Sequence, residues 1–568
     1  MDEELSKKSH KKIRVVDLEG KPKIAYFSME IGIDKRMPTY SGGLGVLAGD
    51  TIKSCADLNI PLVGITLLSE NGYFYQKLDK DGNQTEFPAN FSVSNFLKLL
   101  PSKTTVTIEG RDVDIRAWLY RFKGINGYII PVFFLDSNVE GNSEWDRNLT
   151  KHLYGGDNKY RLAQEIILGI GGIRMLHALG YDTIDKYHMN EGHAALGTLE
   201  LYRQLNDVEK VREQCVFTTH TPVAAGHDQF ELSYAKPMIG DILPDSILKE
   251  IIFENRLNMT RLALFFSHYV NGVAKKHGEV SQLMFPGHSI DSITNGVHTA
   301  TWVSEPFQKL FDKHMPCWRL DPYVLRSAFS INKEEIWHAH MDAKKKLIDF
   351  VNERYNVGMN YNDFTIGFAR RQTAYKRPEL LISDHERLEE IAEKVGPLQI
   401  IYAGKAHPKD ESGKESIKKI FETMKTIRGK VKIIFIHNYD MTIGKMMTAG
   451  TDLWLNTPRR PREASGTSGM KAAHNGVPQF GTLDGWWLEG CIENITGWSI
   501  GPEETEDESD DDVDRNDLYN KLETWIMPKF YNDRDNWIRT MRSCIAINGS
   551  FFNTNRMVQQ YVLNAYFM

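Results

Sequence analysis

The sequence predicts an α/β protein built from two doubly wound domains that face each other. The clearest observation is a series of short apolar runs in the second half of the chain, which alternate with amphipathic stretches such as 379–394 and 415–427. The apolar runs span residues 364–369, 398–404, 431–437, 452–457 and 477–483. Strands that are apolar along their whole length and separated by helices are typical of a parallel sheet covered by helices on both faces.

The first half repeats this pattern less regularly. The apolar run 23–29 leads to a glycine-rich turn and a predicted helix, and a second apolar run follows at 61–68. This order indicates another strand–helix–strand unit. The seam between the two halves lies between the turn at 293–297 and residue 363. We therefore assign residues 1–330 to an N-terminal domain, 331–545 to a C-terminal domain and 546–568 to a final helix.

Composition and charge exclude several classes of protein. Of the 568 residues, 41% are hydrophobic and 25% are charged, and the net charge of −6 argues against a general nucleic-acid-binding protein. The five cysteines contain no C-x-x-C pair, which favours a reducing compartment over a disulfide framework or a zinc site. No signal-peptide segment and no membrane-spanning run is visible. We expect a soluble cytoplasmic protein without a membrane or nucleic-acid partner, in which the acidic run 503–514 is a solvated loop.

Cationic side chains cluster where the predicted strands of the second half end. Ligands bind at the carboxyl ends of strands in open α/β sheets, so the residues after each strand are candidate site residues. Arg370, Arg371 and Lys376 follow the first strand, Lys405 follows the second, and three arginines precede the turn at 465–469. An anion site for phosphate and a solvated basic rim both fit these residues. We favour the anion site, because scattered surface charge would not collect at one edge.

The glycine-rich turn of the first half has two interpretations. The spacing Gly43-x-Gly45-x-x-Ala48, with Glu70 downstream, matches a dinucleotide-binding pattern and suggests a nicotinamide-dependent oxidoreductase. The turn begins about a dozen residues after the preceding strand, however, whereas the dinucleotide pattern opens the first strand–helix turn. Helix-terminal amides that approach an anion, and a purely structural turn, fit the segment equally well.

Two histidine-containing segments also follow apolar runs. His220 lies just after the run C-V-F, so it is a candidate residue at a strand end, although a lone histidine is more often structural. Asn190, Glu191 and His193 lie in H-M-N-E-G-H-A-A, where a helix is expected to begin. The spacing of His188 and His193 suits no common helical zinc pair, so no metal site is predicted.

Lys471 lies in a turn rich in glycine and hydroxyl groups, behind Arg459, Arg460 and Arg462. The two alanines that follow it predict a helix. One interpretation is an exposed helix lysine. The other is a lysine that forms a Schiff base with pyridoxal phosphate, whose phosphate group the amides and hydroxyls of the turn would hold. The segment alone does not decide between them.

Taken together, these segments resemble the glycogen (α-1,4-glucan, maltodextrin) phosphorylase family in its short prokaryotic form. The resembling segments are the cofactor-lysine segment 463–471, the glycine loop 40–48, the phosphate-site segment 368–377, and the central segments 267–277 and 293–297. They occur in the family's order over residues 23 to about 490. The tail 552–561 is similar to the final helices of the wider GT-B glycosyltransferases. The resemblance implies two facing Rossmann-like domains of the GT-B type, an active site in the cleft between them, and a C-terminal helix that returns to the N-terminal domain.

The resemblance also implies an activity. Members of this family transfer the non-reducing terminal glucosyl unit of an α-glucan to inorganic phosphate, which gives α-glucose 1-phosphate with retained configuration. Their cofactor is pyridoxal 5′-phosphate, which acts through its phosphate group as a proton relay. The chain is accordingly expected to be a pyridoxal-phosphate-dependent glycosyltransferase, and a homodimer.

Residue roles follow by position from the same resemblance. Lys471 would hold the aldehyde of the cofactor, and Lys471, Arg371, Lys376 and His220 would be the catalytic residues. The other cofactor-binding residues would be Thr467, Ser468, Arg370 and Tyr439. The substrate phosphate would contact Arg371, Lys376 and the glycine loop at Gly42, Gly43 and Leu44. The glucosyl unit and its surroundings would involve Glu30, Tyr375, Glu463, Ser465, Gly466, Asn295 and His220, whose main-chain carbonyl would face the positive charge that develops on the sugar.

Three departures from the long enzymes leave alternatives open. Arg370 replaces a lysine, which keeps the charge but changes its geometry. The turn reads T-S-G, so the role of Ser468 rests on its backbone amide. The pair Trp486–Trp487 either stacks on sugar rings or packs in the core, which leaves the preferred glucan length open. A nucleotide-sugar glucosyltransferase of the same fold is a rival, but Glu463 is followed at the eighth position by Lys471 instead of a second acid. A non-catalytic carbohydrate-binding protein is the other rival, and it would not need Lys471.

Overall fold

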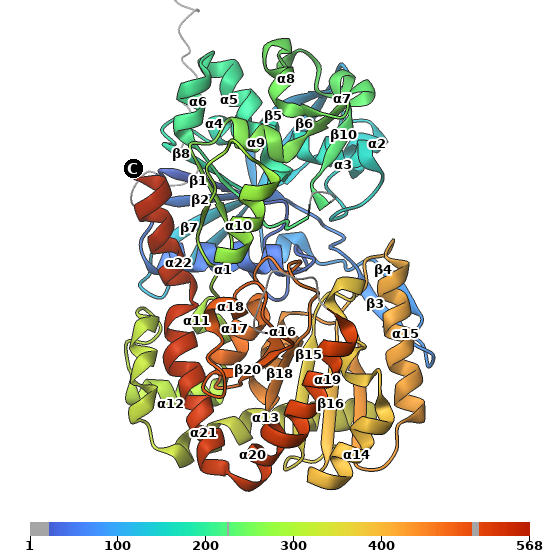
Figure 1. The fold of residues 1–568 in the computed structure, drawn as a ribbon. Helices are drawn as coiled ribbons and strands as arrows, with labels where there is room; N and C mark the ends of the chain where they lie inside the picture. Colours follow the sequence, from blue (N-terminus) through green and yellow to red (C-terminus); the bar gives the residue numbers. More distant parts are fainter. Residues whose placement is uncertain (1–21, 224–225, 503–509, 568) are drawn as a thin grey trace, which may run out of the picture.

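The computed structural model describes residues 22–223, 226–502 and 510–567. A large, mainly parallel sheet lies in each half of the chain, with helices packed against its faces (Figure 1). The predicted mixed α/β class with parallel sheets is therefore confirmed. Within these residues, no helix combines the length and the apolar composition needed to cross a membrane.

The sheet of the second half has six parallel strands in the order β17-β16-β15-β18-β19-β20. This is the 3-2-1-4-5-6 order of a doubly wound sheet, which reverses between β15 and β18. The strands are β15 (Phe364–Ala369), β16 (Leu398–Ala403), β17 (Val431–Ile436), β18 (Leu453–Asn456), β19 (Gln479–Thr482) and β20 (Gly497–Ile500). The five predicted apolar runs all form strands, because their side chains are buried on both faces.

Helices cover both faces of this sheet. On one face, α13 (Lys333–Tyr355) and α16 (Met441–Gly450) pack in a core cluster with Ile401 and Ile434. On the other face, α14 (His385–Val395) and α15 (Glu411–Thr426) pack in a separate cluster with Ile400 and Ile433. Successive strand residues thus enter opposite cores, which explains why the strands are apolar at nearly every position.

The sheet of the first half has nine strands in the order β14-β13-β9-β8-β1-β2-β7-β6-β5. The strands are β1 (Ile24–Phe27), β2 (Leu62–Leu67), β5 (Lys98–Ile108), β6 (Arg111–Lys123), β7 (Ile129–Asp136), β8 (Lys186–Asn190), β9 (Cys215–Thr218), β13 (Tyr269–Gly272) and β14 (Asp291–Ser292). The pairs from β14 to β7 are parallel, as predicted. The long strands β5 and β6 are antiparallel and were not predicted, because they alternate buried and exposed residues instead of forming apolar runs.

Helix α1 (Gly43–Asp57) lies between the two sheets, next to α16 and α17 (Thr467–Ala473) (Figure 1). A small hydrophobic cluster joins the halves at this point and includes Val46, Trp302, Met441 and Met470. The hydroxyl of Tyr40, just before the glycine loop, accepts a hydrogen bond of 3.0 Å from the backbone N–H of Met441. The glycine loop is therefore fixed against the second sheet as well as the first.

Two segments, residues 303–331 and the C-terminal helix, also connect the two halves of the chain. Residues between Val303 and Ile331 pack in the core of the six-stranded sheet, although they precede the boundary expected at residue 330. The last helix, α22 (Thr554–Tyr561), crosses the junction and reaches the first sheet (Figure 1). There Asn271 Nδ2 donates to the Tyr561 hydroxyl at 3.0 Å, and the Tyr566 hydroxyl lies 2.7 Å from His188 Nδ1.

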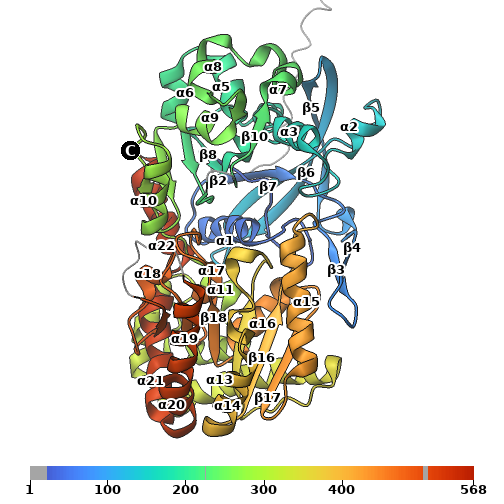
Figure 2. The same ribbon diagram turned by 45° about the vertical axis from the view of Figure 1, so that its right-hand side comes forward.

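A hairpin of the first half, β3 (Tyr75–Leu78) and β4 (Gln84–Phe87), extends alongside α15 of the second half (Figure 2). The backbone N–H of Gln76 donates to Asn438 Oδ1 at 3.0 Å, and Lys405 Nζ donates to the carbonyl of Phe74 at 2.7 Å. Lys405, one of the cations at the strand ends, therefore joins the two halves of the chain through a backbone carbonyl.

The acidic run 503–514 is not a solvated loop over its described part, residues 510–514. Asp510 caps α19 (Asp511–Lys521) by accepting hydrogen bonds from two backbone N–H groups of its first turn. The Asp514 side chain is fully buried and pairs with Arg377 Nη2 at 2.7 Å. The prediction was wrong here because charge density alone does not show which carboxylate meets a buried arginine. Residues 503–509 lie outside the described residues.

Candidate active site

Lys471 is buried, with 6% of its surface exposed, so the interpretation as an exposed helix lysine is wrong. It lies in α17, and its Nζ is 3.8 Å from the centroid of the Trp302 ring. Among the described residues, none accepts a hydrogen bond from this amine or forms an ion pair with it. Burial is the main reason that the pKa of Lys471 falls to about 8; Asp50 opposes this effect, and Lys53 and Arg370 add to it. At pH 7 about a tenth of the amine is therefore neutral and nucleophilic, far more than for a lysine with an ordinary pKa of about 10.4.

Three predicted site residues form one buried ion-pair cluster. Glu463 accepts from Arg370 Nη2 at 2.8 Å and pairs with the ammonium group of Lys376. Burial alone would raise the pKa of Glu463, but the charges of Arg370 and Lys376 bring it to about 2, so the carboxylate stays ionised. The two cations follow β15 and Glu463 follows β18, the two strands at which the sheet order reverses. The strand order therefore explains how residues 370, 376 and 463 meet.

Glu30 holds the glycine loop in place. Its Oε2 accepts hydrogen bonds from the backbone N–H groups of Ser41 and Gly42, and its Oε1 accepts one of 2.9 Å from the Tyr154 hydroxyl. A Cβ atom at Gly45 would lie 2.7 Å from Glu30 Oε2, so the carboxylate fits only against a glycine. The contacts of Glu30 in the structure are thus to the loop.

An accessible gap separates the glycine loop from Arg371. A Cβ atom built on Gly42 would lie 4.0 Å from Arg371 Nη2, and one built on Gly43 would meet no atom within 4 Å. Both Gly43 and Arg371 are exposed to solvent, and Leu44 beside them is half-buried. Within the described chain, Arg371 forms no ion pair. A guanidinium group opposite the N-terminal amides of the 15-residue helix α1 suits an anion.

The same loop disfavours the dinucleotide interpretation. Strand β1 ends at Phe27 and α1 begins at Gly43, so the glycines do not form a direct strand-to-helix turn.

Several buried polar atoms around Glu463 lack a hydrogen-bond partner within the part of the chain that the structure describes. They are Arg370 Nη1, Ser465 Oγ, and both Asn456 Oδ1 and Asn456 Nδ2. Gly466 adopts a left-handed φ of 89°, and a Cβ atom there would lie 3.5 Å from Asn456 Nδ2. Buried polar atoms in folded proteins nearly always have partners, so this group of donors and acceptors indicates the position of a polar ligand.

The residues predicted to surround the cofactor lie near this group. Thr467 is the first residue of α17. The Ser468 hydroxyl accepts a hydrogen bond of 3.1 Å from Trp454 Nε1 and keeps its own O–H to donate, and the backbone N–H of Ser468 lies in the first turn of α17. Burial raises the pKa of the half-buried Tyr439, and the charge of Arg370 opposes this rise, which puts the phenol within electrostatic range of that guanidinium.

His220 and Asn295 belong to the ends of strands in the first sheet. His220 follows β9; its Nε2 lies 2.7 Å from Asn190 Oδ1, and its backbone N–H donates to Glu191 Oε2 at 2.7 Å. Burial lowers the pKa of His220 to about 3, so the ring is neutral. Asn295 is buried, and its Oδ1 has no partner within the described chain. Neither residue has a direct polar contact with the Glu463 cluster among the described residues.

Sequence reasoning missed an aromatic pocket in which Tyr73, Tyr154 and His407 lie within electrostatic range of Arg371. This pocket has a volume of about 590 Å³ and includes residues of both halves of the chain. Its walls include Tyr73, Tyr154, Tyr160, His152, His407 and Lys409. These residues lie in segments far apart in the sequence, so no sequence motif predicts the pocket. Tyr375, which was predicted, is half-buried, and the ammonium group of Lys376 lies 4.4 Å from its ring centroid.

Asp484 was also missed as a site residue, because only its position after β19 marked it. Its Oδ2 accepts the backbone N–H of Glu463 at 2.8 Å, and its Oδ1 accepts that of Gly485. Burial raises the pKa of Asp484 to about 7, and the negative charge of Glu463 contributes.

Trp486 and Trp487 are fully buried, which decides between the two interpretations of this pair. Their rings pack against each other and against Phe552 at the junction of the halves. The pair therefore belongs to the core and has no face free for a sugar ring.

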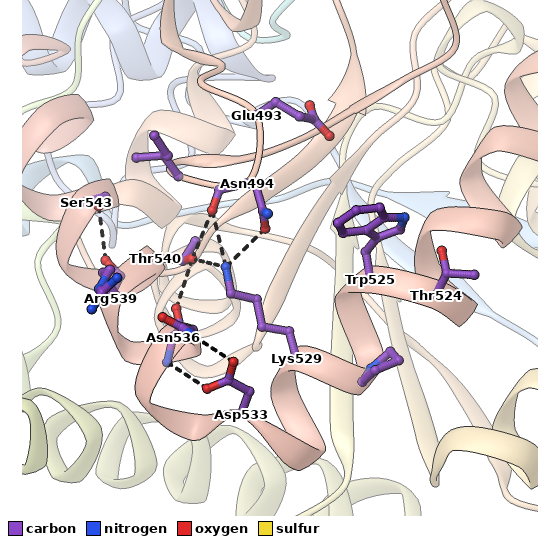
Figure 3. Close-up of a pocket in the computed structure, with 12 residues that line it drawn as sticks. Glu493, Asn494, Thr524, Trp525, Lys529, Asp533, Asn536, Arg539, Thr540 and Ser543 are labelled. Carbon is purple, nitrogen blue, oxygen red and sulfur yellow. Dashed lines mark hydrogen bonds between the residues drawn. The ribbon is translucent and has the colours of Figure 1, made fainter.

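A larger pocket lies elsewhere, on the surface of the second half (Figure 3). Its volume is about 710 Å³, and the exposed side chains of Trp525 and Ile495 line it. Lys529 Nζ donates to Asn494 Oδ1 at 3.1 Å and to Thr540 Oγ1 at 2.8 Å (Figure 3). None of the residues that line this pocket carries a buried polar atom without a partner among the described residues.

Two largely parallel sheets, joined at a site with a buried nucleophilic lysine, paired cations and a glycine loop, define an α/β enzyme that handles anionic ligands. Comparison with known proteins identifies the family. The carbohydrate phosphorylase family profile matches residues 228–497. The chain is 40% identical to the maltodextrin phosphorylase of Thermococcus litoralis, over 95% of this chain and 70% of that protein. The chain belongs to the carbohydrate phosphorylase family.

Two glycogen phosphorylases are also similar. The enzyme of Mycobacterium tuberculosis is 34% identical, over 96% of this chain and 70% of its own length. The enzyme of Aquifex aeolicus is 32% identical, over 96% of this chain and 86% of its own length. The resemblance recognised in the sequence is therefore confirmed.

Proposed function

We propose that this chain is an α-1,4-glucan phosphorylase, which transfers the non-reducing terminal glucosyl unit of an α-glucan to inorganic phosphate and yields α-glucose 1-phosphate. The single observation that carries the proposal is the buried amine of Lys471, which has no anionic partner among the described residues and a pKa near 8. A nucleotide-sugar transferase or a sugar-binding protein has no use for such an amine, whereas an enzyme that binds an aldehyde cofactor requires it.

We further propose that the two sheets belong to two Rossmann-like domains of the GT-B type. The packing of residues 303–331 on the second sheet supports a boundary near Trp302 instead of residue 330. The contacts of Tyr561 and Tyr566 with the first sheet support a C-terminal helix that returns to the N-terminal domain.

The residues around Lys471 fit pyridoxal 5′-phosphate. Lys471 offers a neutral amine for the aldehyde, and Arg370 Nη1 and Ser465 Oγ are buried polar atoms without partners in the described chain. We assign Arg370 and the backbone amides of Thr467 and Ser468 to the phosphate group of the cofactor, and Tyr439 to its surroundings. The bound cofactor supplies a phosphate group whose second pKa, about 6, allows it to exchange a proton at neutral pH.

We assign the substrate phosphate to the gap between Arg371 and the glycine loop. Arg371 presents its guanidinium there, and the N–H groups of Gly43 and Leu44 lie at the N-terminus of α1, whereas that of Gly42 donates to Glu30 in the structure. Lys376, which pairs with Glu463, would offset part of the charge of two neighbouring phosphates. Glu463 offsets only one of the two positive charges of Arg370 and Lys376, so the cluster keeps a net positive charge that suits a bound anion.

The glucosyl unit fits between these cations and the strand ends of the first sheet. Its expected neighbours are Glu30, Tyr375, Glu463, Ser465, Gly466, His220 and Asn295. The imidazole of His220 is neutral and hydrogen-bonded to Asn190, which leaves its main-chain carbonyl as the group that can stabilise positive charge on the sugar. The aromatic pocket beside Arg371 offers tyrosine rings on which further glucose units of the chain can stack. We also propose a homodimer, which light scattering on the purified protein tests.

The experiment that tests the function is phosphorolysis by the purified protein. With maltodextrin, inorganic phosphate and pyridoxal 5′-phosphate, the protein should release glucose 1-phosphate, and the reaction should require all three. Glucosyl transfer from a nucleotide sugar, without phosphorolysis, would favour the glucosyltransferase alternative. Glucan binding without either reaction would favour the binding protein.

A further inference from the structure

The amine of Lys471 contacts an aromatic ring instead of a carboxylate. Its Nζ lies 3.8 Å from the centroid of the Trp302 ring, and both side chains are buried. The face of an indole attracts an ammonium group, but it carries no net charge that would keep the amine protonated, as a carboxylate in direct contact would. This contact therefore fixes the position of the amine and still allows it to lose its proton.

Asp50 fixes the indole in turn. Trp302 Nε1 donates to Asp50 Oδ2 at 2.6 Å, and the backbone N–H of His298 donates to the same oxygen at 3.1 Å. The other oxygen, Asp50 Oδ1, lies 3.6 Å from Lys53 Nζ and accepts no hydrogen bond within the described chain. A hydrogen bond from the indole N–H to a buried carboxylate polarises the ring and strengthens its attraction for a cation.

Asn475 links the two contact partners through their backbones. Its Nδ2 donates to the carbonyl of Trp302 at 3.1 Å and to the carbonyl of Lys471 at 2.9 Å, and its Oδ1 accepts the backbone N–H of Ser304 at 2.7 Å. Helix α1, residues 298–304 and helix α17 are thus held together around the lysine. Asp50 comes from the first half of the chain and Lys471 from the second.

We propose that Asp50 and Trp302 are positioning residues for Lys471: the Asp50 carboxylate holds the Trp302 indole, and the indole face holds the Lys471 amine where it reacts with the aldehyde of the cofactor. This inference rests on the proposed function, because it takes Lys471 as the residue that binds pyridoxal 5′-phosphate. The reaction joins Nζ to the aldehyde carbon and releases one water, and it requires the neutral amine. The charged groups that act on this amine are Asp50 and Lys53 of α1 and Arg370 from the loop after β15.

The test is the rate at which pyridoxal 5′-phosphate attaches to Lys471 in the full chain freed of cofactor. Cyanoborohydride traps the product, and peptide mapping locates it. The rate should rise with pH as the amine loses its proton and then reach a plateau. The midpoint of this rise reports the charge around the amine, and the plateau reports its orientation. Thermal unfolding of each variant shows that it is folded.

Asp50→Asn should change both quantities. The midpoint should move to lower pH, because loss of a negative charge disfavours the protonated amine. The plateau should also fall, because the neutral amide oxygen of asparagine accepts the indole N–H more weakly than the carboxylate does, so the indole and the amine are held less firmly. Trp302→Phe keeps a ring face but loses the Nε1 hydrogen bond, so its plateau should fall similarly with a smaller shift of the midpoint.

Asp57→Asn is the matched control. Asp57 is a buried carboxylate of the same helix that lies 2.9 Å from His298 Nε2 and does not contact the Trp302 indole N–H. It should change neither the midpoint nor the plateau. Profiles of Asp50→Asn and Trp302→Phe that match the native protein, or an equal change in Asp57→Asn, would overturn the proposal. Failure of the native chain itself to attach the cofactor at Lys471 would instead refute the proposed function. If Trp302→Phe does not fold, the shift of the midpoint and the fall of the plateau in Asp50→Asn still test the proposal.

Discussion

The Lys471 region and the pocket beside Trp525 use polar side chains in opposite ways. In the surface pocket, Lys529 donates to Asn494 and Thr540, and Asn536 Nδ2 donates to Asp533 Oδ2 at 2.6 Å (Figure 3). At the junction of the two halves, by contrast, buried atoms of Arg370, Asn456 and Ser465 lack partners in the described chain. The surface pocket is thus the region whose polar groups already satisfy one another.

For this reason we place the candidate site by its buried polar atoms without partners and not by the volume of a pocket. Burial lowers the pKa of Lys529, but hydrogen bonds to Asn494 and Thr540 offset part of this cost. Burial also lowers the pKa of Lys471, and among the described residues no hydrogen-bond acceptor offsets the cost to stability. Proteins retain such costly groups where function requires them.

Replacing Lys471 should abolish activity, whereas replacing Lys529 should not. Lys471→Ala removes the amine assigned to the cofactor, so phosphorolysis should fall by about a thousandfold or more. Lys529→Ala removes a lysine of the surface pocket and should leave phosphorolysis near the native level while lowering the unfolding temperature. Release of glucose 1-phosphate is the measurement for both. Appreciable turnover by Lys471→Ala, with added pyridoxal 5′-phosphate, would show that the Lys471 amine is not required for phosphorolysis.

Arg371→Ala should impair the kinetics with respect to phosphate and leave the KM for the glucan unchanged. Loss of a charged hydrogen-bonding group that faces the glycine loop should raise the apparent KM for phosphate, or lower kcat/KM for phosphate, by about a hundredfold. Lys376→Ala should act in the same direction. The KM for maltodextrin, measured in the same preparations, is the internal control. Unchanged phosphate kinetics in both variants would show that the anion site lies elsewhere.

Asp514→Asn should lower stability more than the acidic composition of its segment suggests. The carboxylate is fully buried and pairs with Arg377 Nη2, so its removal takes one of two counter-ions from this buried guanidinium and leaves it with the partly exposed Asp511, which should cost about 3 kcal/mol. Asp512→Asn is the matched control, because Asp512 lies in the same first turn of α19 but is 76% exposed. Denaturant unfolding measures the difference. Equal stability of the two variants would restore the interpretation of this segment as a solvated loop.

Asp484 should make stability depend on pH. Its pKa is raised to about 7 in the folded chain from a usual value of about 3.9, so the folded state binds this proton more tightly. Its contribution to the free energy of unfolding is therefore fully present below the unfolded pKa and is lost as pH rises through about 7. Asp484→Asn should abolish this loss, so the variant should gain stability relative to the native protein between acidic and mildly alkaline pH. Parallel pH profiles of the two proteins would contradict the assignment.

The sequence predicted most strands of the second sheet. It did not predict which acidic residue pairs with the cations at the carboxyl ends of these strands. The runs that became β15 to β19 are apolar on both faces, and this signal requires no knowledge of the rest of the fold. The cations after β15 were also predicted, because strand ends are the known place for ligands. That Glu463 pairs with Arg370 and Lys376 depends on strand order, which no local pattern contains. Strands β5 and β6 were missed because one face of each is polar.

The residues around Lys471 illustrate the same limit. The glycines and hydroxyl groups next to it drew attention to the lysine, since a local turn has a local signature. Trp302 and Asp50 lie 169 and 421 residues away in the sequence and meet Lys471 only through the junction of the two halves. The aromatic pocket beside Arg371 is built in the same way from distant loops.

The central claim is that the buried amine of Lys471 carries an aldehyde cofactor. The most direct measurement is borohydride reduction of the protein purified with pyridoxal 5′-phosphate, followed by peptide mapping and an absorbance spectrum before and after reduction. We predict one pyridoxyl phosphate adduct, on the peptide that contains Lys471, and loss of the cofactor absorbance band on reduction. Absence of an adduct, or an adduct on another lysine such as Lys376 or Lys405, would contradict the account.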